Sequence, residues 1–167
     1  IGHYYWDVLI ASHPVLLGEY RKVFGDERAS YQDALDRHYK RSMNDDSWQG
    51  EFISRYASMH PWEDWAETWA HYLHMLDTLE TAQVYGIVTE AENAEIIDTK
   101  EIALPQEERY YGKNSSIGDI VSNWIYFSVV LNALNRSMGL PDAYPFVISD
   151  AIRAKLAFVH RTIHSVS

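Results

Sequence analysis

The sequence predicts a mainly α-helical protein of six or seven helices with little or no sheet. Two observations support this fold class: apolar residues recur three or four positions apart in the longest segments, and Pro and Gly stand where those segments begin and end. With 167 residues, 47% hydrophobic and 23% charged, the chain is long enough to bury a core and is not disordered. We expect a single domain over residues 1–167.

Three helices are expected in the first part of the chain. Residues 1–11 are aromatic and aliphatic and predict a buried helix, but no capping residue precedes them. We therefore expect this helix to begin upstream, and the chain to be the C-terminal part of a longer protein. Pro14 breaks the first helix, the second covers residues 15–24, and the third runs from Glu27 to about Met43.

The longest periodic segment begins at Pro61 and ends at Tyr85, just before a glycine. Pro at the first helical position and two acidic residues in the first turn are typical of a helix start. Residues 48–56, which precede it, are also expected to form a helix.

Two helices are expected near the C-terminus, after an irregular segment over residues 90–112 with mixed charge. The first covers residues 117–138, which are apolar on most faces and end at Gly139. The second covers residues 150–164, where apolar residues lie at helical spacing.

Charge and composition exclude several classes of function. Lys and Arg number 14 and Asp and Glu 24, giving a net charge of −10, which disfavours nucleic acid or an anionic membrane as a partner. There is no cysteine, so a metal site must use His, Asp or Glu. No uninterrupted apolar run reaches the roughly 18 residues of a membrane span, and we expect a cytoplasmic protein. The oligomeric state is left open.

Four polar residues share one face of the helix that begins at Pro61. Their spacings of four, four and three residues place Glu63, Glu67, His71 and His74 in one stripe. For the two histidines, a surface stripe paired with the glutamates is the favoured interpretation. For the two glutamates, a functional role is favoured.

His3 is a second candidate, with Asp7 one helical turn later. A lone His on an apolar helix is usually a hydrogen-bonded core residue. However, mononuclear zinc enzymes gather their ligands from separate elements, and here a His at the start of one helix can meet a Glu at the start of another.

At this point the sequence resembles a known family. Residues 1–7, Ile-Gly-His-Tyr-Tyr-Trp-Asp, resemble the second half of a His-Glu-x-x-His (HExxH) helix, and residues 56–74 resemble its partner helix. The segment Trp-Glu-Asp-Trp-Ala-Glu (62–67) is the most specific part. Together with residues 134–141, these segments are similar to the bacterial zinc-binding metallopeptidases that carry an N-terminal zinc ribbon before a zincin domain. The resemblance covers essentially the whole chain.

The resemblance implies a gluzincin-type metallopeptidase, a hydrolase that cleaves peptide bonds of a peptide or protein substrate with water activated by one zinc ion. His3 corresponds to the second His of the motif and Glu63 to the third ligand, so their side-chain nitrogen and oxygen should lie within about 5 Å. The first His and the catalytic Glu would be the two residues before Ile1. We therefore expect this chain by itself to be inactive, with zinc absent or weakly bound.

The resemblance also implies supporting roles. Glu67 would accept a hydrogen bond from a coordinating imidazole, and Asp7 competes for this role. Tyr56 would stabilise the oxyanion of a tetrahedral intermediate, although a packing role is equally open. His60 either caps the helix or lines the cleft, and the cap is favoured.

Two alternatives come from other classes. The chain could be a non-catalytic helical module that binds another protein. A carboxylate-bridged dimetal bundle is disfavoured because it needs Glu-x-x-His pairs on two helices, whereas Glu67 and His71 have the wrong spacing.

Overall fold

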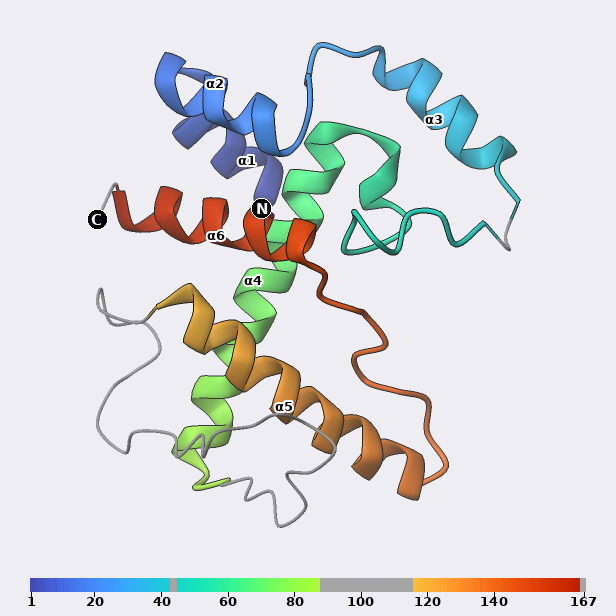
Figure 1. The fold of residues 1–167 in the computed structure, drawn as a ribbon, viewed down its shortest axis with the longest axis vertical. Coiled ribbons are helices and arrows are strands. Elements are labelled where there is room, and N and C mark those ends of the chain that lie inside the picture. Colours follow the sequence, from blue (N-terminus) through green and yellow to red (C-terminus); the bar gives the residue numbers. More distant parts are fainter. Residues whose placement is uncertain (43–44, 88–115, 166–167) are drawn as a thin grey trace. The chain divides into compact units, whose positions relative to one another are not determined.

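The structure is a computed structural model that describes residues 1–42, 45–87 and 116–165. Its elements are α1 (Gly2–Trp6), a π-helical turn η1 (Asp7–Ala11), α2 (Pro14–Val23), α3 (Tyr31–Lys40), a 3-10 turn η2 (Ala57–Met59), α4 (Pro61–Val84), α5 (Ile117–Ser137) and α6 (Asp150–Ser165). Strands are missing from these ranges, which confirms the mainly α fold (Figure 1). The irregular segment expected over residues 90–112 lies outside the described residues.

The chain divides into two compact units. The first contains residues 1–73 and 146–167, and the second contains residues 74–145. Helix α4 contributes its first half to one unit and its second half to the other. The single domain expected over residues 1–167 stays a prediction.

Helix α4 has the boundaries that the sequence predicts. It begins at Pro61 with Glu63 and Asp64 in its first turn, where negative charge is favoured by the helix dipole. It ends at Val84, and Gly86 then adopts a φ of +65°, a conformation that L side chains rarely take.

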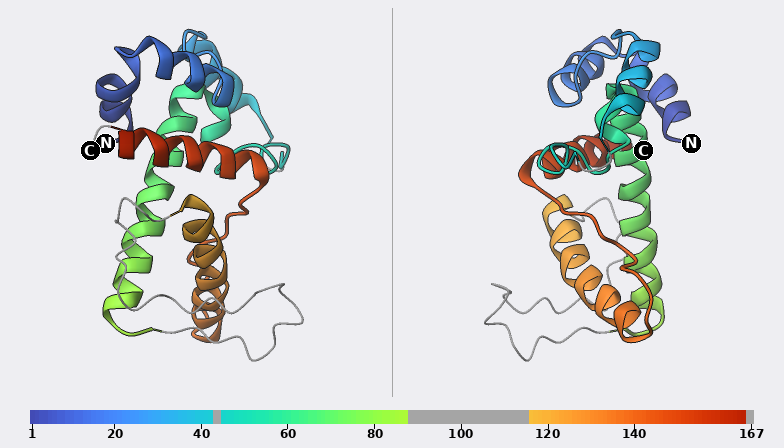
Figure 2. Two further views of the ribbon diagram at one scale, coloured as in Figure 1. Left: turned by 60° about the vertical axis from the view of Figure 1, so that its left-hand side comes forward. Right: turned by 90° about the vertical axis from the view of Figure 1, so that its right-hand side faces the viewer.

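The first unit has an aromatic core made by α2, α4 and α6. Tyr20 and Trp65 are fully buried, and Phe158 of α6 packs edge-on against Trp65 with 6.1 Å between ring centroids. Figure 2 shows α6 crossing α4, with α2 close to it. Large rings buried from three helices therefore hold the first half of α4 in place.

Helix α1 approaches α4 very closely at Gly2. A Cβ atom at this position would lie 2.7 Å from the Cα of Ala66, so only glycine fits. The indole Nε1 of Trp65 donates a hydrogen bond to the Gly2 carbonyl at 2.9 Å. This contact brings the next residue, His3, to the first turn of α4.

Two expectations for the N-terminal segments were wrong in detail. Residues 1–11 are helical, but Tyr4 and Val8 are exposed and only Gly2 and Ile10 are buried, so the segment is not a buried helix. Helix α3 begins at Tyr31 instead of Glu27, because the Oγ of Ser30 accepts the backbone N–H of Asp33 and caps the helix there.

The helix expected over residues 48–56 is also wrong. These residues form turns that lead into η2. In a helix the carbonyl of Glu51 would accept the N–H of Arg55, but here it accepts a hydrogen bond of 2.6 Å from the Nζ of Lys155. The guanidinium of Arg55 donates to the carbonyls of Arg41 and Ser42. Side chains distant in sequence therefore hold this segment in a non-helical form.

In the second unit, α5 is joined to the segment that follows it. The amide of Asn132 donates to the Tyr144 carbonyl and accepts its N–H, at 2.8 and 2.9 Å. The ring of Tyr144 meets that of Trp124 edge-on, with 4.8 Å between centroids.

Helix α5 combines length with an apolar composition. Among the described residues it is the one helix long and apolar enough, by length and composition, to cross a membrane. Asn and Ser interrupt its apolar residues, so no uninterrupted apolar run reaches 18 residues. The mean hydropathy of its 18-residue window is nevertheless 1.3. This is weak evidence, since a core helix of a soluble protein passes the same test.

Candidate metal site

The first turn of α4 is fixed by His60. The Nδ1 of this residue accepts the backbone N–H of Trp62 at 3.1 Å, and its Nε2 lies 3.0 Å from the carbonyl oxygen of Ala29, to which it donates. The carbonyl of His60 accepts the N–H groups of Glu63 and Asp64. Both ring nitrogens are thus engaged, and His60 caps α4 and ties it to the segment before α3.

The side chain of Glu63, in the first turn of α4, lies next to that of His3 in α1. The Nε2 of His3 lies 3.2 Å from the Oε2 of Glu63, which confirms that the two side chains come together. Glu63 is buried, and the Nε2 atom of His3 is buried without a hydrogen-bond partner. The two atoms are therefore close without a hydrogen bond between them.

This spacing fits two ligands of one zinc ion. Ligand bonds of about 2.0–2.1 Å at a tetrahedral angle place two donor atoms about 3.3 Å apart. The imidazole of His3 is oriented by the indole of Trp62, with 4.2 Å between ring centroids. Imidazole nitrogen and carboxylate oxygen are both common zinc ligands. Across the ranges that the structure describes, no group of three or more His, Asp or Glu residues gathers in a way that could hold a metal.

Tyr31 supports the other oxygen of the carboxylate. Its phenol donates a hydrogen bond to the Oε1 of Glu63 at 2.8 Å. Hydrogen bonds with Tyr56 and then with Glu63 raise the pKa of Tyr31 above its ordinary value, so the phenol keeps its proton and remains a donor. Sequence reasoning missed Tyr31, which carries no local signal and reaches Glu63 only through the fold.

Tyr56 lies at the edge of the same site. Its side chain is 39% exposed and hydrogen-bonds Tyr31, so it is connected to Glu63 through one phenol. The oxyanion role of this phenol stays a prediction.

Glu67 and Asp7 occupy different environments. The Oε2 of Glu67 accepts a hydrogen bond of 2.7 Å from the Oγ of Ser54, which also accepts the N–H of Ala57. Glu67 thus holds the turn that carries Tyr56. Asp7 is exposed, and its backbone N–H donates to the carbonyl of His3, but among the described residues no hydrogen bond joins its carboxylate to the His3 imidazole.

A buried ion pair lies directly behind Glu63. The Nζ of Lys155 is 2.7 Å from the Oδ2 of Asp64, and both side chains are almost fully buried. Burial raises the pKa of Asp64 to about 7, while Lys155 opposes this shift. The pair joins α6 to the first turn of α4 and so holds Glu63 in position.

The stripe of four polar residues on α4 does not lie on the surface as a whole. Glu63 and His71 are buried, and His71 packs edge-on against Phe146 with 4.7 Å between ring centroids. His74 is exposed. The surface interpretation was therefore wrong for His71.

A comparison with known families identifies the chain. A family model described as "Putative zinc-binding metallo-peptidase" matches residues 1–162. The chain belongs to this family. The matched range includes both His3 and Glu63.

The relatives give no further detail on activity. The chain is 41% identical over 167 residues to proteins named as uncharacterized from Mycobacterium tuberculosis (Rv2568c and MT2644) and Mycobacterium bovis (Mb2598c). The match covers 100% of this chain and 45% of each relative, so the chain spans about half the length of the curated relatives that it matches. No solved structure matches it.

Proposed function

We propose that the complete protein is a zinc-dependent peptidase in which His3 and Glu63 are two of the three protein ligands. One observation carries this proposal: the Nε2 of His3 and the Oε2 of Glu63 lie 3.2 Å apart, and the Nε2 is buried without a hydrogen-bond partner. Membership of the metallopeptidase family supports it. The presumed substrate is a peptide or protein.

The side chains around the pair prepare it for a cation. A buried carboxylate such as Glu63 needs a positive partner or hydrogen bonds to stay ionised. Tyr31 donates one hydrogen bond to Oε1, which leaves Oε2 directed at His3. When bound, zinc would supply a Lewis acid and lower the pKa of its water ligand toward 7.

The remaining parts of the machinery follow from the resemblance. It places the first His and the catalytic Glu directly before Ile1, so the proposal concerns the complete protein. Glu67 would then accept a hydrogen bond from the first His, and the phenol of Tyr56 would stabilise the developing oxyanion.

The test compares Glu63→Gln with Glu80→Gln in the complete protein. Glu80 lies on the same helix and its substitution makes the same charge change. Zinc content is measured by mass spectrometry, affinity by competition with a chromophoric chelator, and activity on an unfolded protein substrate. We expect the first variant to lose zinc and activity and the second to keep both. Equal zinc affinity in the two variants would remove Glu63 from the ligand set.

A second function, the non-catalytic interaction module, has its own support in exposed aromatic side chains. Tyr4 is 64% exposed and Tyr39 is 77% exposed. A complete protein that binds zinc but cleaves no substrate would favour this alternative.

A further inference from the structure

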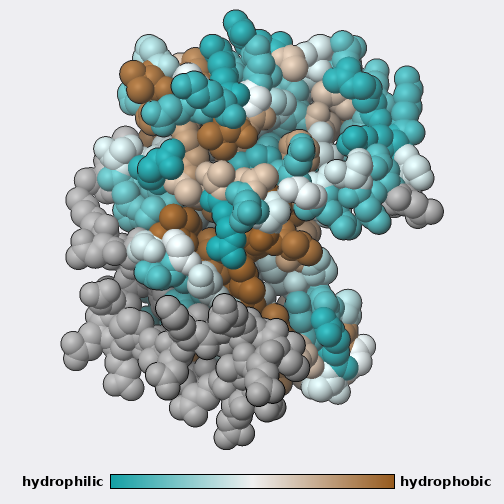
Figure 3. Space-filling model, in the orientation of Figure 1, coloured by the Kyte–Doolittle hydropathy of each residue, from teal (hydrophilic) through white to brown (hydrophobic). Residues whose placement is uncertain are grey.

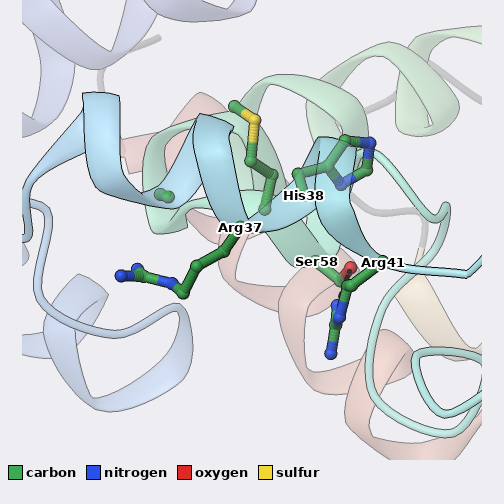
Figure 4. Close-up of a pocket in the computed structure, with 6 residues that line it drawn as sticks. Arg37, His38, Arg41 and Ser58 are labelled. Atoms are coloured by element: carbon green, nitrogen blue, oxygen red, sulfur yellow. Dashed lines mark hydrogen bonds between the residues drawn. The ribbon is translucent and has the colours of Figure 1, made fainter.

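A cavity of about 230 Å³ lies between α3 and η2 in the first unit. Figure 4 shows the side chain of Arg37 extending from α3 and that of Arg41, the residue after α3, extending in a different direction beside Ser58. The cavity is lined by Ala34, Arg37, His38, Arg41, Ser58 and Met59. Ala34 and Met59 are buried and give the cavity an apolar wall, whereas the arginines give it a cationic rim.

Two of the six lining residues are arginines, although the chain as a whole carries a charge of −10. The surface over α3 is largely hydrophilic (Figure 3). Burial first, and then the positive charges of Arg55 and Arg41, lower the pKa of His38, so its imidazole stays neutral. The arginines nevertheless keep their charge at every physiological pH.

Hydrogen-bond donors remain available at the rim. Among the described residues, Arg37 makes neither an ion pair nor a hydrogen bond, and the Nδ1 of His38 is buried without a partner. Arg41 is partly engaged, since it lies 3.3 Å from Asp45 and donates to Ser58 at 3.2 Å. A guanidinium that lacks an internal partner is suited to bind a carboxylate through two parallel hydrogen bonds.

The cavity adjoins the candidate metal site on the side of Tyr56. The ring of His38 meets that of Tyr56 edge-on, with 5.9 Å between centroids. Tyr56 in turn hydrogen-bonds Tyr31, which donates to Glu63. The phenols of Tyr56 and Tyr31 thus connect the lining residue His38 to Glu63.

We propose that this cavity binds a carboxylate of the peptide substrate, with the guanidinium of Arg37 binding the charge and Ala34 and Met59 contacting the methylene groups. The carboxylate comes from an Asp or Glu side chain or from the C-terminus of the peptide. This inference rests on the proposed peptidase function and adds its substrate class.

The experiment uses the complete protein and matched octapeptides of neutral residues. One series moves a single Glu along the peptide, with Gln at the same positions as the reference, and a second compares a free C-terminal acid with the amide. We expect Glu at one position, compared with Gln, or the free C-terminal acid, compared with the amide, to raise kcat/KM about tenfold, mainly through a lower KM. The series that responds identifies the source of the carboxylate.

Variants then assign the preference to the cavity. Arg37→Gln should abolish the preference for the carboxylate, and Arg41→Gln should weaken it. Arg161→Gln on α6 is the matched control, because it removes the same charge from an exposed position. Circular dichroism verifies that each variant is folded.

Peptide binding, measured by fluorescence anisotropy, separates the two proposals. Equal binding and equal cleavage of the acidic and neutral peptides would overturn the carboxylate site and leave the peptidase intact. Preferential binding that Arg37→Gln abolishes, without cleavage of any peptide, would refute the proposed function but keep the carboxylate site. A preference that survives Arg37→Gln and Arg41→Gln would also overturn the site.

Discussion

Gly2 shows how one residue without a side chain positions the candidate site. We expect Gly2→Ala to destabilise the protein by about 1–3 kcal/mol, because the new Cβ would lie 2.7 Å from the backbone of Ala66. Urea unfolding gives this difference. Gly18→Ala in α2 is the control: no atom lies within 4 Å of its added Cβ, so it should stabilise the protein by about 0.5–1 kcal/mol. Equal stability of the two variants would contradict the close helix contact.

The buried pair of Asp64 and Lys155 leads to a second prediction at this scale. Lys155→Met leaves the buried Asp64 side chain without its partner, so that it must take up a proton or stay as an uncompensated carboxylate, and should cost up to about 3–5 kcal/mol above pH 7. The double variant Asp64→Asn/Lys155→Met should recover part of this loss, which a double-mutant cycle in urea unfolding measures. If the two single losses simply add, the ion pair is not coupled.

The pH dependence of stability follows from the same carboxyl group. The pKa of Asp64 in the folded protein is about 7, above the ordinary 3.8. Between these values the folded protein keeps a proton that the unfolded chain has lost. The contribution of Asp64 to stability is therefore complete below about pH 4 and is lost as the pH rises toward 7. Asp64→Asn should flatten this part of the stability profile, and an unchanged slope would assign it to other groups.

Among the elements, α4 was predictable and the segment before it was not. Pro61 and the glycine after α4 are local signals, and they mark its boundaries correctly. Residues 48–56 have a helical pattern, but the Nζ of Lys155, 104 positions away in the sequence, donates a hydrogen bond to the carbonyl of Glu51. No local pattern reveals this contact. The pairing of His3 with Glu63 was predictable because the resemblance covers both segments. Tyr31 was missed because only the packing of α3 brings it there.

The contact between α3 and α4 gives a prediction about metal binding. Tyr31→Phe removes the hydrogen bond to the Oε1 of Glu63, and we expect it to weaken zinc binding about 10- to 100-fold in the complete protein. Tyr39→Phe is the control, since Tyr39 lies on the same helix and is 77% exposed. Chelator competition measures both affinities. Equal weakening by the two substitutions would show that Tyr31 does not act through Glu63.

For the whole molecule, the decisive comparison is between this chain and the complete protein. In the proposed site His3 and Glu63 would supply two protein ligands, whereas catalytic zinc sites use three. His60 cannot replace the third, because both of its ring nitrogens are engaged.

We therefore expect the 167-residue chain to bind zinc several orders of magnitude more weakly than the complete protein and to show no peptidase activity. The aromatic core around Trp65 lies within the helices of the first unit, so the chain should still fold, and circular dichroism verifies this. Activity is measured with added zinc on an unfolded protein substrate, with the complete protein beside it and a chelator as the reference. The contrary outcome is chelator-sensitive turnover by the chain alone at a rate comparable to that of the complete protein. It would show that residues 1–167 contain a full set of ligands and a general base. The assignment of His3 and Glu63 would then have to be abandoned.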